Sequence, residues 1–264
     1  MANNPAWTRI TAIYSRLDSG ESRAMYVKAE NGNEYVAKGP SLTPTWRHVG
    51  ANELIAFRLA ERMGLPVLDC RVLQFEGELY VGHTRMQENQ FHPYLTSELL
   101  ARCSNLDRVY GLVVFDSWVC NTDRHEGNLL VRCSNSAGLA NGRCAADEHT
   151  VLVNDHNRCL LPDNRETSHF SSLSGEYLAE FIQIGFIRDR IYSLGGLKDA
   201  IEQAERVSDI EISSIVNGVP PELLPDEDKA HWTEFLINRR GSLRRLFAAE
   251  HNRRLFRYLP GGSI

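Results

Sequence analysis

The chain changes from apolar to polar and back to apolar within one stretch, VFDSWVCNTDRHEGNLL, which runs from Val114 to Leu130. Residues 106–120, which overlap the start of this stretch, are apolar on nearly all sides and predict a buried helix. The residues that follow, 129–132 and 150–153, predict the two strands of a hairpin with a long polar tip. Polar groups between buried elements must be hydrogen-bonded or used by a site, so this stretch is the first candidate for function.

Three interpretations fit the polar part of this stretch. Asp123 and His125, together with the Asn-Asp-His-Asn run at 154–157, could supply ligands of a two-metal hydrolase. No Gly-Asn-His-Asp/Glu run and no His-Glu-x-x-His motif accompanies them. A hydrogen-bonded turn without catalysis would explain an isolated aspartate. Phosphoryl transfer requires more: a carboxylate for the attacking hydroxyl, an amide and a second carboxylate for metal ions, and a cation for the nucleotide phosphates.

The sequence holds each part that phosphoryl transfer requires, in the expected order. Asp123 and Asn128 have the Asp-x-x-x-x-Asn spacing that puts a base and a metal ligand on one loop. Asp155 follows the returning strand of the hairpin, which brings it back beside that loop. Lys38 ends a predicted strand, the position held in kinases by the lysine of the Val-Ala-Ile-Lys strand. Glu53 can pair with it from the next predicted helix. Phosphoryl transfer is therefore the favoured interpretation.

The stretch from Val114 to Leu130 resembles the catalytic segment of HipA-like kinases, and it is similar to the Asp-Arg-His-x-x-Asn loop of phosphatidylinositol kinases. The resemblance extends over residues 14–247. It implies a bilobal protein-kinase-like fold, with ATP and Mg²⁺ as cofactors. It also implies the site roles: Asp123 is the catalytic carboxylate, Asn128 and Asp155 bind magnesium, Lys38 contacts the ATP phosphates, and Glu53 fixes Lys38.

The phosphate-binding loop departs from the kinase pattern, because the chain has no Gly-x-Gly-x-x-Gly run before Lys38. Only the segment 17–23, with one glycine, occupies the corresponding position. We expect Ser19, Gly20 and Ser22 to reach the phosphates through hydroxyl and backbone N–H groups. The resemblance gives Arg124 a role in shaping the loop rather than in chemistry.

The order of the predicted elements indicates an α+β chain in two lobes. Short strands and one helix, expected at 52–63, fill residues 1–88, and Asn31-Gly32 marks a hairpin turn among them. Predicted helices dominate residues 89–264, and the last four are expected at 176–184, 197–207, 211–216 and 228–246. We therefore expect a β-rich N-lobe that binds the nucleotide phosphates and a mostly helical C-lobe that carries the catalytic loop and the metal-binding hairpin.

Composition and charge exclude several classes of protein. The 264 residues carry 29 basic and 34 acidic side chains, and the net charge of −5 disfavours nucleic acid as the primary partner. No apolar run is long enough to span a membrane, and no secretory signal is visible at the N-terminus. Six scattered cysteines without a Cys-x-x-Cys pair predict free thiols and a cytoplasmic protein. Seven arginines in 238–264 are interpreted as a solvated helix face.

These observations together predict an ATP- and Mg²⁺-dependent kinase that phosphorylates a serine or threonine hydroxyl on a protein. The resemblance to HipA-like kinases adds a growth-arresting toxin or a defence-system kinase as the biological role, and a cognate regulator or antitoxin as a partner. Two alternatives remain open at this point. One is a small-molecule phosphotransferase, and the other is a pseudokinase that acts as an interaction module without catalysis.

Overall fold

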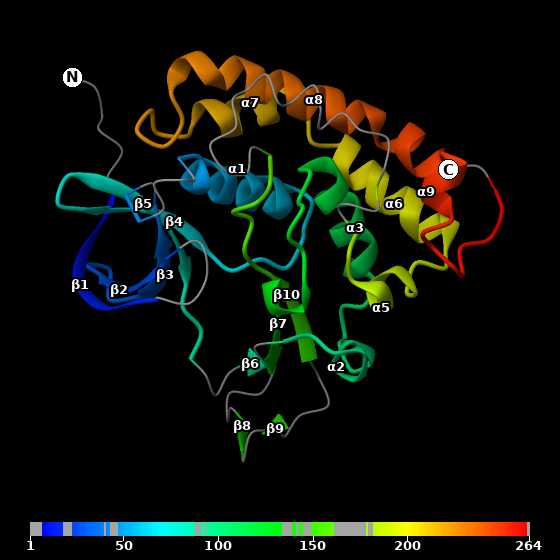
Figure 1. The fold of residues 1–264 in the computed structure, drawn as a ribbon, viewed down its shortest axis with the longest axis horizontal. Helices are drawn as coiled ribbons and strands as arrows, with labels where there is room; N and C mark the ends of the chain where they lie inside the picture. Colours follow the sequence, from blue (N-terminus) through cyan, green and yellow to red (C-terminus); the bar gives the residue numbers. More distant parts are fainter. Residues whose placement is uncertain are drawn as a thin grey trace.

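The computed structural model describes the following parts of the chain. They are residues 7–17, 23–39, 41–42, 47–87, 91–92, 94–133, 139–140, 143–144, 149–160, 178 and 182–262. Figure 1 shows a barrel of strands at one side, helix α1 next to it, a small sheet beneath, and the remaining long helices at the other side and above.

Five strands of the first part of the chain close into a barrel with the order β1-β2-β3-β5-β4. Side chains alternate along them, and the inward residues form a separate apolar core that includes Val27, Tyr35 and Leu73. The turn between β2 and β3 contains Gly32, whose φ of +83° is the left-handed value that the Asn-Gly signal predicts. The strands are β1 (Thr8–Arg16), β2 (Met25–Ala29), β3 (Glu34–Lys38), β4 (Cys70–Phe75) and β5 (Glu78–Thr84).

Helix α1 (Val49–Arg62) packs between this barrel and the rest of the molecule (Figure 1). It begins three residues before the predicted start and is buried along most of its length. Gly64 follows its end with φ of +68°, the left-handed conformation in which glycine commonly ends a helix. Glu53 therefore lies in the second turn of α1, whereas the predicted start at 52 would place it in the first turn.

The polar stretch between 121 and 128 connects a buried helix to a strand, as predicted. Helix α3 (Arg108–Trp118) is buried on nearly all sides, and the short 3₁₀ turn 126–128 leads into β7. Strand β7 pairs antiparallel with β10, and β6 adds a third strand that the sequence did not predict. These strands are β6 (Phe91–His92), β7 (Leu129–Cys133) and β10 (His149–Val153), and a separate pair is β8 (Leu139–Ala140) with β9 (Arg143–Cys144).

Helices form most of the described chain after β10, with α6, α7 and α8 near the predicted positions. The helix expected at 176–184 falls largely outside the described residues, and residues 182–184 are not helical. The remaining helices are α2 (Ser97–Ala101), α5 (Gly185–Arg188), α6 (Leu194–Glu205), α7 (Asp209–Asn217), α8 (Asp226–Ala248) and α9 (Glu250–Arg253).

The structure is a mixed α+β fold, as the sequence predicts. None of the described helices is both long and apolar enough to cross a bilayer. The expectation of free thiols is confirmed for four buried cysteines, Cys70, Cys103, Cys120 and Cys159. It is wrong for Cys133, which is disulfide-bonded.

Candidate active site

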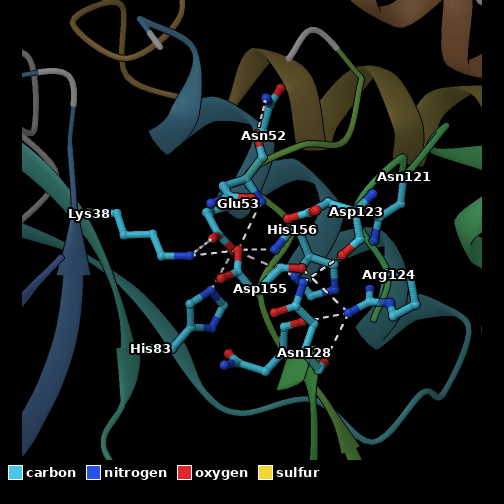
Figure 2. A network of polar contacts seen from close by, with 12 residues as sticks. Lys38, Asn52, Glu53, His83, Asn121, Asp123, Arg124, Asn128, Asp155 and His156 are labelled. Atoms are coloured by element: carbon cyan, nitrogen blue, oxygen red, sulfur yellow. Dashed lines mark hydrogen bonds and ion pairs between the residues drawn. The ribbon is translucent and has the colours of Figure 1, made fainter. Parts of the chain in front are cut away.

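Lys38 is a buried cation held by two carboxylates. It is the last residue of β3, and its Nζ donates to Glu53 Oε1 at 2.6 Å and to Asp155 Oδ1 at 2.7 Å (Figure 2). The side chain of Lys38 is 7% exposed. Burial by itself disfavours the ammonium form, but the two carboxylates outweigh this effect and raise the pKa of Lys38 above its usual value. Lys38 therefore stays charged, and it contacts an aspartate 117 positions further along the chain.

Glu53 is fully buried and accepts hydrogen bonds from three elements. Its Oε1 accepts from Lys38, and its Oε2 accepts from His83 Nε2 at 2.9 Å and from the backbone N–H of His156 at 3.0 Å. Burial opposes the charge of this carboxyl, but Lys38 and then His83 and His156 lower its pKa well below the usual range. Glu53 is thus a fixed carboxylate at the junction of α1, β3 and β5.

Asp155 lies two residues after β10 and has an unusual backbone conformation. Its φ is +56°, a left-handed value that aspartate tolerates better than most residues and that recurs at functional sites. This conformation turns its carboxylate toward Lys38, and the side chain remains 25% exposed. A carboxylate that is paired on one oxygen and reachable by solvent is suited to bind a cation.

Arg124 ties the polar loop to the segment after β10. Its Nη1 donates to the backbone carbonyls of Asn128 at 3.0 Å, Asn154 at 2.5 Å and Asp155 at 3.4 Å. Its Nε and Nη2 bond the carboxylate of Asp116 on α3 at 2.9 and 3.0 Å. The two candidate magnesium ligands, Asn128 and Asp155, are therefore held by one guanidinium (Figure 2).

Asp123 and Asn128 are joined across the same loop. Asn128 Nδ2 donates to the backbone carbonyl of Asp123 at 2.7 Å, which leaves the amide oxygen of Asn128 as its ligand atom. The backbone N–H of Asp123 donates to Asn121 Oδ1 at 3.1 Å, and Asn121 Nδ2 donates to Asp116. The loop conformation is thus set by side-chain to backbone bonds that originate from α3.

A cavity of about 310 Å³ opens beside these groups. Lys38 and Asp155 line it, together with Val36 on β3 and His83 on β5. Strand alternation explains this set, because Val36 and Lys38 share one face of β3 and His83 is the direct partner of Val36 on β5. Arg85 also lines the cavity, and its Cζ lies 4.4 Å from the centre of the Tyr26 ring.

The structure brings together five of the eight predicted site residues: Lys38, Glu53, Asp123, Asn128 and Asp155. Ser19, Gly20 and Ser22 lie outside the described residues. Sequence reasoning missed His83 and Asp116. A histidine at the end of an otherwise apolar strand and an acid inside an apolar helix are the signals that could have found them.

The residues present fit ATP with Mg²⁺. Asp155 offers a partly exposed carboxylate and Asn128 an amide oxygen, which are ligand types that Mg²⁺ prefers. Lys38 is a buried cation beside the cavity, as the phosphates of a nucleotide require. When bound, the metal would supply positive charge to the phosphates.

The family model for HipA-like kinases matches residues 10–173, more than half of the chain. In structure, the chain is similar to the Helicobacter pylori proinflammatory kinase CtkA, with a TM-score of 0.61 and 16% identity over 92% of this chain and 96% of CtkA. A second similar structure is HipA from the Shewanella oneidensis MR-1 toxin–antitoxin system, solved with HipB and operator DNA. Its TM-score is 0.48, with 14% identity over 89% of this chain and 68% of HipA.

No protein of curated function matches the sequence significantly. At 16% identity, the similarity to CtkA shows a shared fold and no more. The family match covers all but the first two residues of the barrel strands, the loop at 121–128 and Asp155. It confirms the resemblance drawn from the sequence: the chain belongs to the HipA-like kinase family.

Proposed function

We propose that this protein is an ATP- and Mg²⁺-dependent kinase that phosphorylates a serine or threonine hydroxyl on a protein. The observation that carries the proposal is the contact of Lys38 with both Glu53 and Asp155, because it joins β3, α1 and the segment after β10 at one point. A buried lysine whose ion pair only stabilises the fold needs one carboxylate as its partner. Two carboxylates on one buried lysine, one of them partly exposed to a cavity, fit a nucleotide site better.

Each residue has a distinct role in this proposal. Asp123 orients the attacking hydroxyl and accepts its proton, while Asn128 and Asp155 bind Mg²⁺. Lys38 binds the nucleotide phosphates, and Glu53 keeps Lys38 in place. Most of the rate enhancement in phosphoryl transfer comes from such fixed charges, and Arg124 and Asp116 hold the loop that carries them.

Two further elements complete the proposed site. We assign the barrel side of the molecule, residues 1–88, to an N-lobe and residues 89–264 to a C-lobe, with adenine in the cavity between Tyr26 and Leu130. Ser19, Gly20 and Ser22 would contact the phosphates. Family membership supports a cytoplasmic kinase that arrests growth or acts in defence, with a cognate regulator or antitoxin as partner.

Nucleotide binding and phosphate transfer, measured on matched variants, test the proposal. With Mg²⁺ and a non-hydrolysable ATP analogue, calorimetry should show binding by the wild type and at least about tenfold weaker binding by Lys38→Met, since a charged phosphate contact is lost. Lys28→Met is the control, because Lys28 is an exposed lysine on β2. Unchanged affinity in Lys38→Met would contradict the assignment of Lys38.

Transfer is measured with labelled ATP and a cell extract as the source of substrates. Labelled proteins are expected with the wild type, and none with Asp123→Asn or Asp155→Asn, while Asp199→Asn on α6 is the matched control. Label only in the low-molecular-weight fraction would identify a small-molecule phosphotransferase. ATP binding without any transfer would identify a pseudokinase.

A further inference from the structure

A second group of ligand-type side chains shares Glu53 with the Lys38 ion pair. One ligand atom each of Glu53, His83 and His156 lies within 4.8 Å of the other two (Figure 2). All three residues are buried: Glu53 and His156 are 0% exposed and His83 is 4% exposed. They come from α1, β5 and the segment after β10, so only the folded chain assembles them.

Several ring nitrogens of this group have no hydrogen-bond partner. Among the described residues, neither ring nitrogen of His156 forms a hydrogen bond, and His83 Nδ1 forms none either. Buried polar atoms are nearly always hydrogen-bonded, so three unpaired nitrogens in one place require an explanation. The chemistry of imidazole offers one, since a neutral ring nitrogen is the commonest protein ligand for transition metals.

The distances also favour a shared ion. His156 Nδ1 lies 3.6 Å from Glu53 Oε2, which is too long for a hydrogen bond. Two ligand atoms of a tetrahedral zinc ion are roughly 3.4 Å apart, given metal–ligand bonds of about 2.0–2.1 Å. His83 Nε2 lies 2.9 Å from the same Oε2 atom. All three ligand atoms lie within 4.8 Å of one another, so side-chain shifts on the order of an ångström would place them around one ion.

We propose that Glu53, His83 and His156 form a buried binding site for one divalent transition-metal ion of the zinc class. The ligand atoms are Glu53 Oε2, His83 Nε2 and His156 Nδ1. Two imidazoles and one carboxylate are a donor set that zinc favours, whereas magnesium prefers oxygen ligands alone. The site is therefore distinct in chemistry from the proposed magnesium ligands Asn128 and Asp155.

The surroundings of the group accommodate this ion. Glu53 Oε1 stays with Lys38 while Oε2 binds the metal, and Asp155 supplies further negative charge on the other side of Lys38. His83 also lines the cavity, so a fourth ligand can enter from that side. The ion would fasten β5, α1 and the segment after β10 together.

Zinc binding to the full chain, measured without nucleotide, tests this site independently of the proposed kinase activity. Protein stripped with a chelator is titrated with Zn²⁺ by calorimetry, and one ion per chain is expected. His83→Asn and His156→Asn should each lower the affinity at least about tenfold. His231→Asn, an exposed histidine on α8, and Asn128→Ala should bind zinc as the wild type does.

Three outcomes would overturn the proposal. They are equal zinc affinity in the wild type and His83→Asn, the absence of any stoichiometric zinc binding, and loss of zinc binding in Asn128→Ala, which would place the ion at the magnesium ligands. Circular dichroism shows whether each variant is folded. If the histidine variants do not fold, X-ray absorption of the cobalt-loaded wild type decides: scattering from histidine rings supports the site, and its absence overturns it.

Discussion

The guanidinium of Arg124 forms a two-pronged contact with the carboxylate of Asp116, at 2.9 and 3.0 Å, and each residue is 2% exposed. Because Arg124 also donates to three backbone carbonyls, the pair connects helix α3 to both candidate metal ligands. This pair is buried and fully hydrogen-bonded, so its removal affects more than one contact.

We expect Arg124→Met to destabilise the protein by about 3–5 kcal/mol, because it leaves the Asp116 carboxylate buried without its cation. Urea unfolding measures this. The double variant Arg124→Met/Asp116→Leu should lose less than the sum of the two single changes. The control is Arg71→Met, whose partner Asp69 is half exposed, with an expected loss below about 1 kcal/mol. Equal losses at Arg124 and Arg71 would contradict the structure.

The buried side chain of His48 makes the free energy of unfolding depend on pH. Burial and then the nearby Arg47 lower the pKa of His48 from 6.5 to about 4, and its ring lies 5.6 Å from that of Trp232. In the unfolded chain the His48 ring is therefore protonated below about pH 6.5, whereas in the folded chain it stays neutral down to about pH 4. Stability from this group is present above pH 6.5 and falls as the pH drops toward 4.

The free energy of unfolding, measured from pH 7.5 to pH 4.5, tests this prediction. His48→Phe should remove about 2 kcal/mol of the acid-side loss relative to the wild type. The comparison is between pH slopes, so a general change of stability in the variant does not affect it. His231→Phe, an exposed histidine on α8, should leave the slope unchanged. An identical slope in His48→Phe and the wild type would show that His48 is not a buried neutral group.

Two glycines should respond to alanine in opposite directions. A methyl group on Gly82 in β5 would lie 2.5 Å from Leu73 Cδ1 inside the barrel, so Gly82→Ala should cost about 1–3 kcal/mol. Gly241 lies on an exposed face of α8 with no atom within 4 Å of the added methyl, and Gly241→Ala should stabilise by about 0.5–1 kcal/mol. Thermal unfolding of the two variants measures both effects, and a stabilised Gly82→Ala would disprove the packing of β5 against β4.

The sequence predicted the elements that carry strong local signals and missed those that do not. The Asn-Gly turn, helix α3 and strands β3, β4 and β7 follow from turn chemistry and apolar runs. Strand β1 was missed because Ile10 is its one buried residue, so it lacks the alternating pattern. The arginine-rich segment was interpreted as solvated, yet Arg239 is buried and donates from Nε to the carbonyl of Ser117 at 3.0 Å.

By itself, the sequence determined the family, the α+β class and the order of Lys38, Glu53, Asp123, Asn128 and Asp155, because these depend on spacing along the chain. Only the tertiary structure decided which side chains hold that set in place. His83 reaches Glu53 across 30 residues and His156 does so across 103, and such contacts form only when the barrel and the β7–β10 hairpin close on α1. Local propensity carries no information about this closure, since it results from burial of surfaces that are distant in sequence.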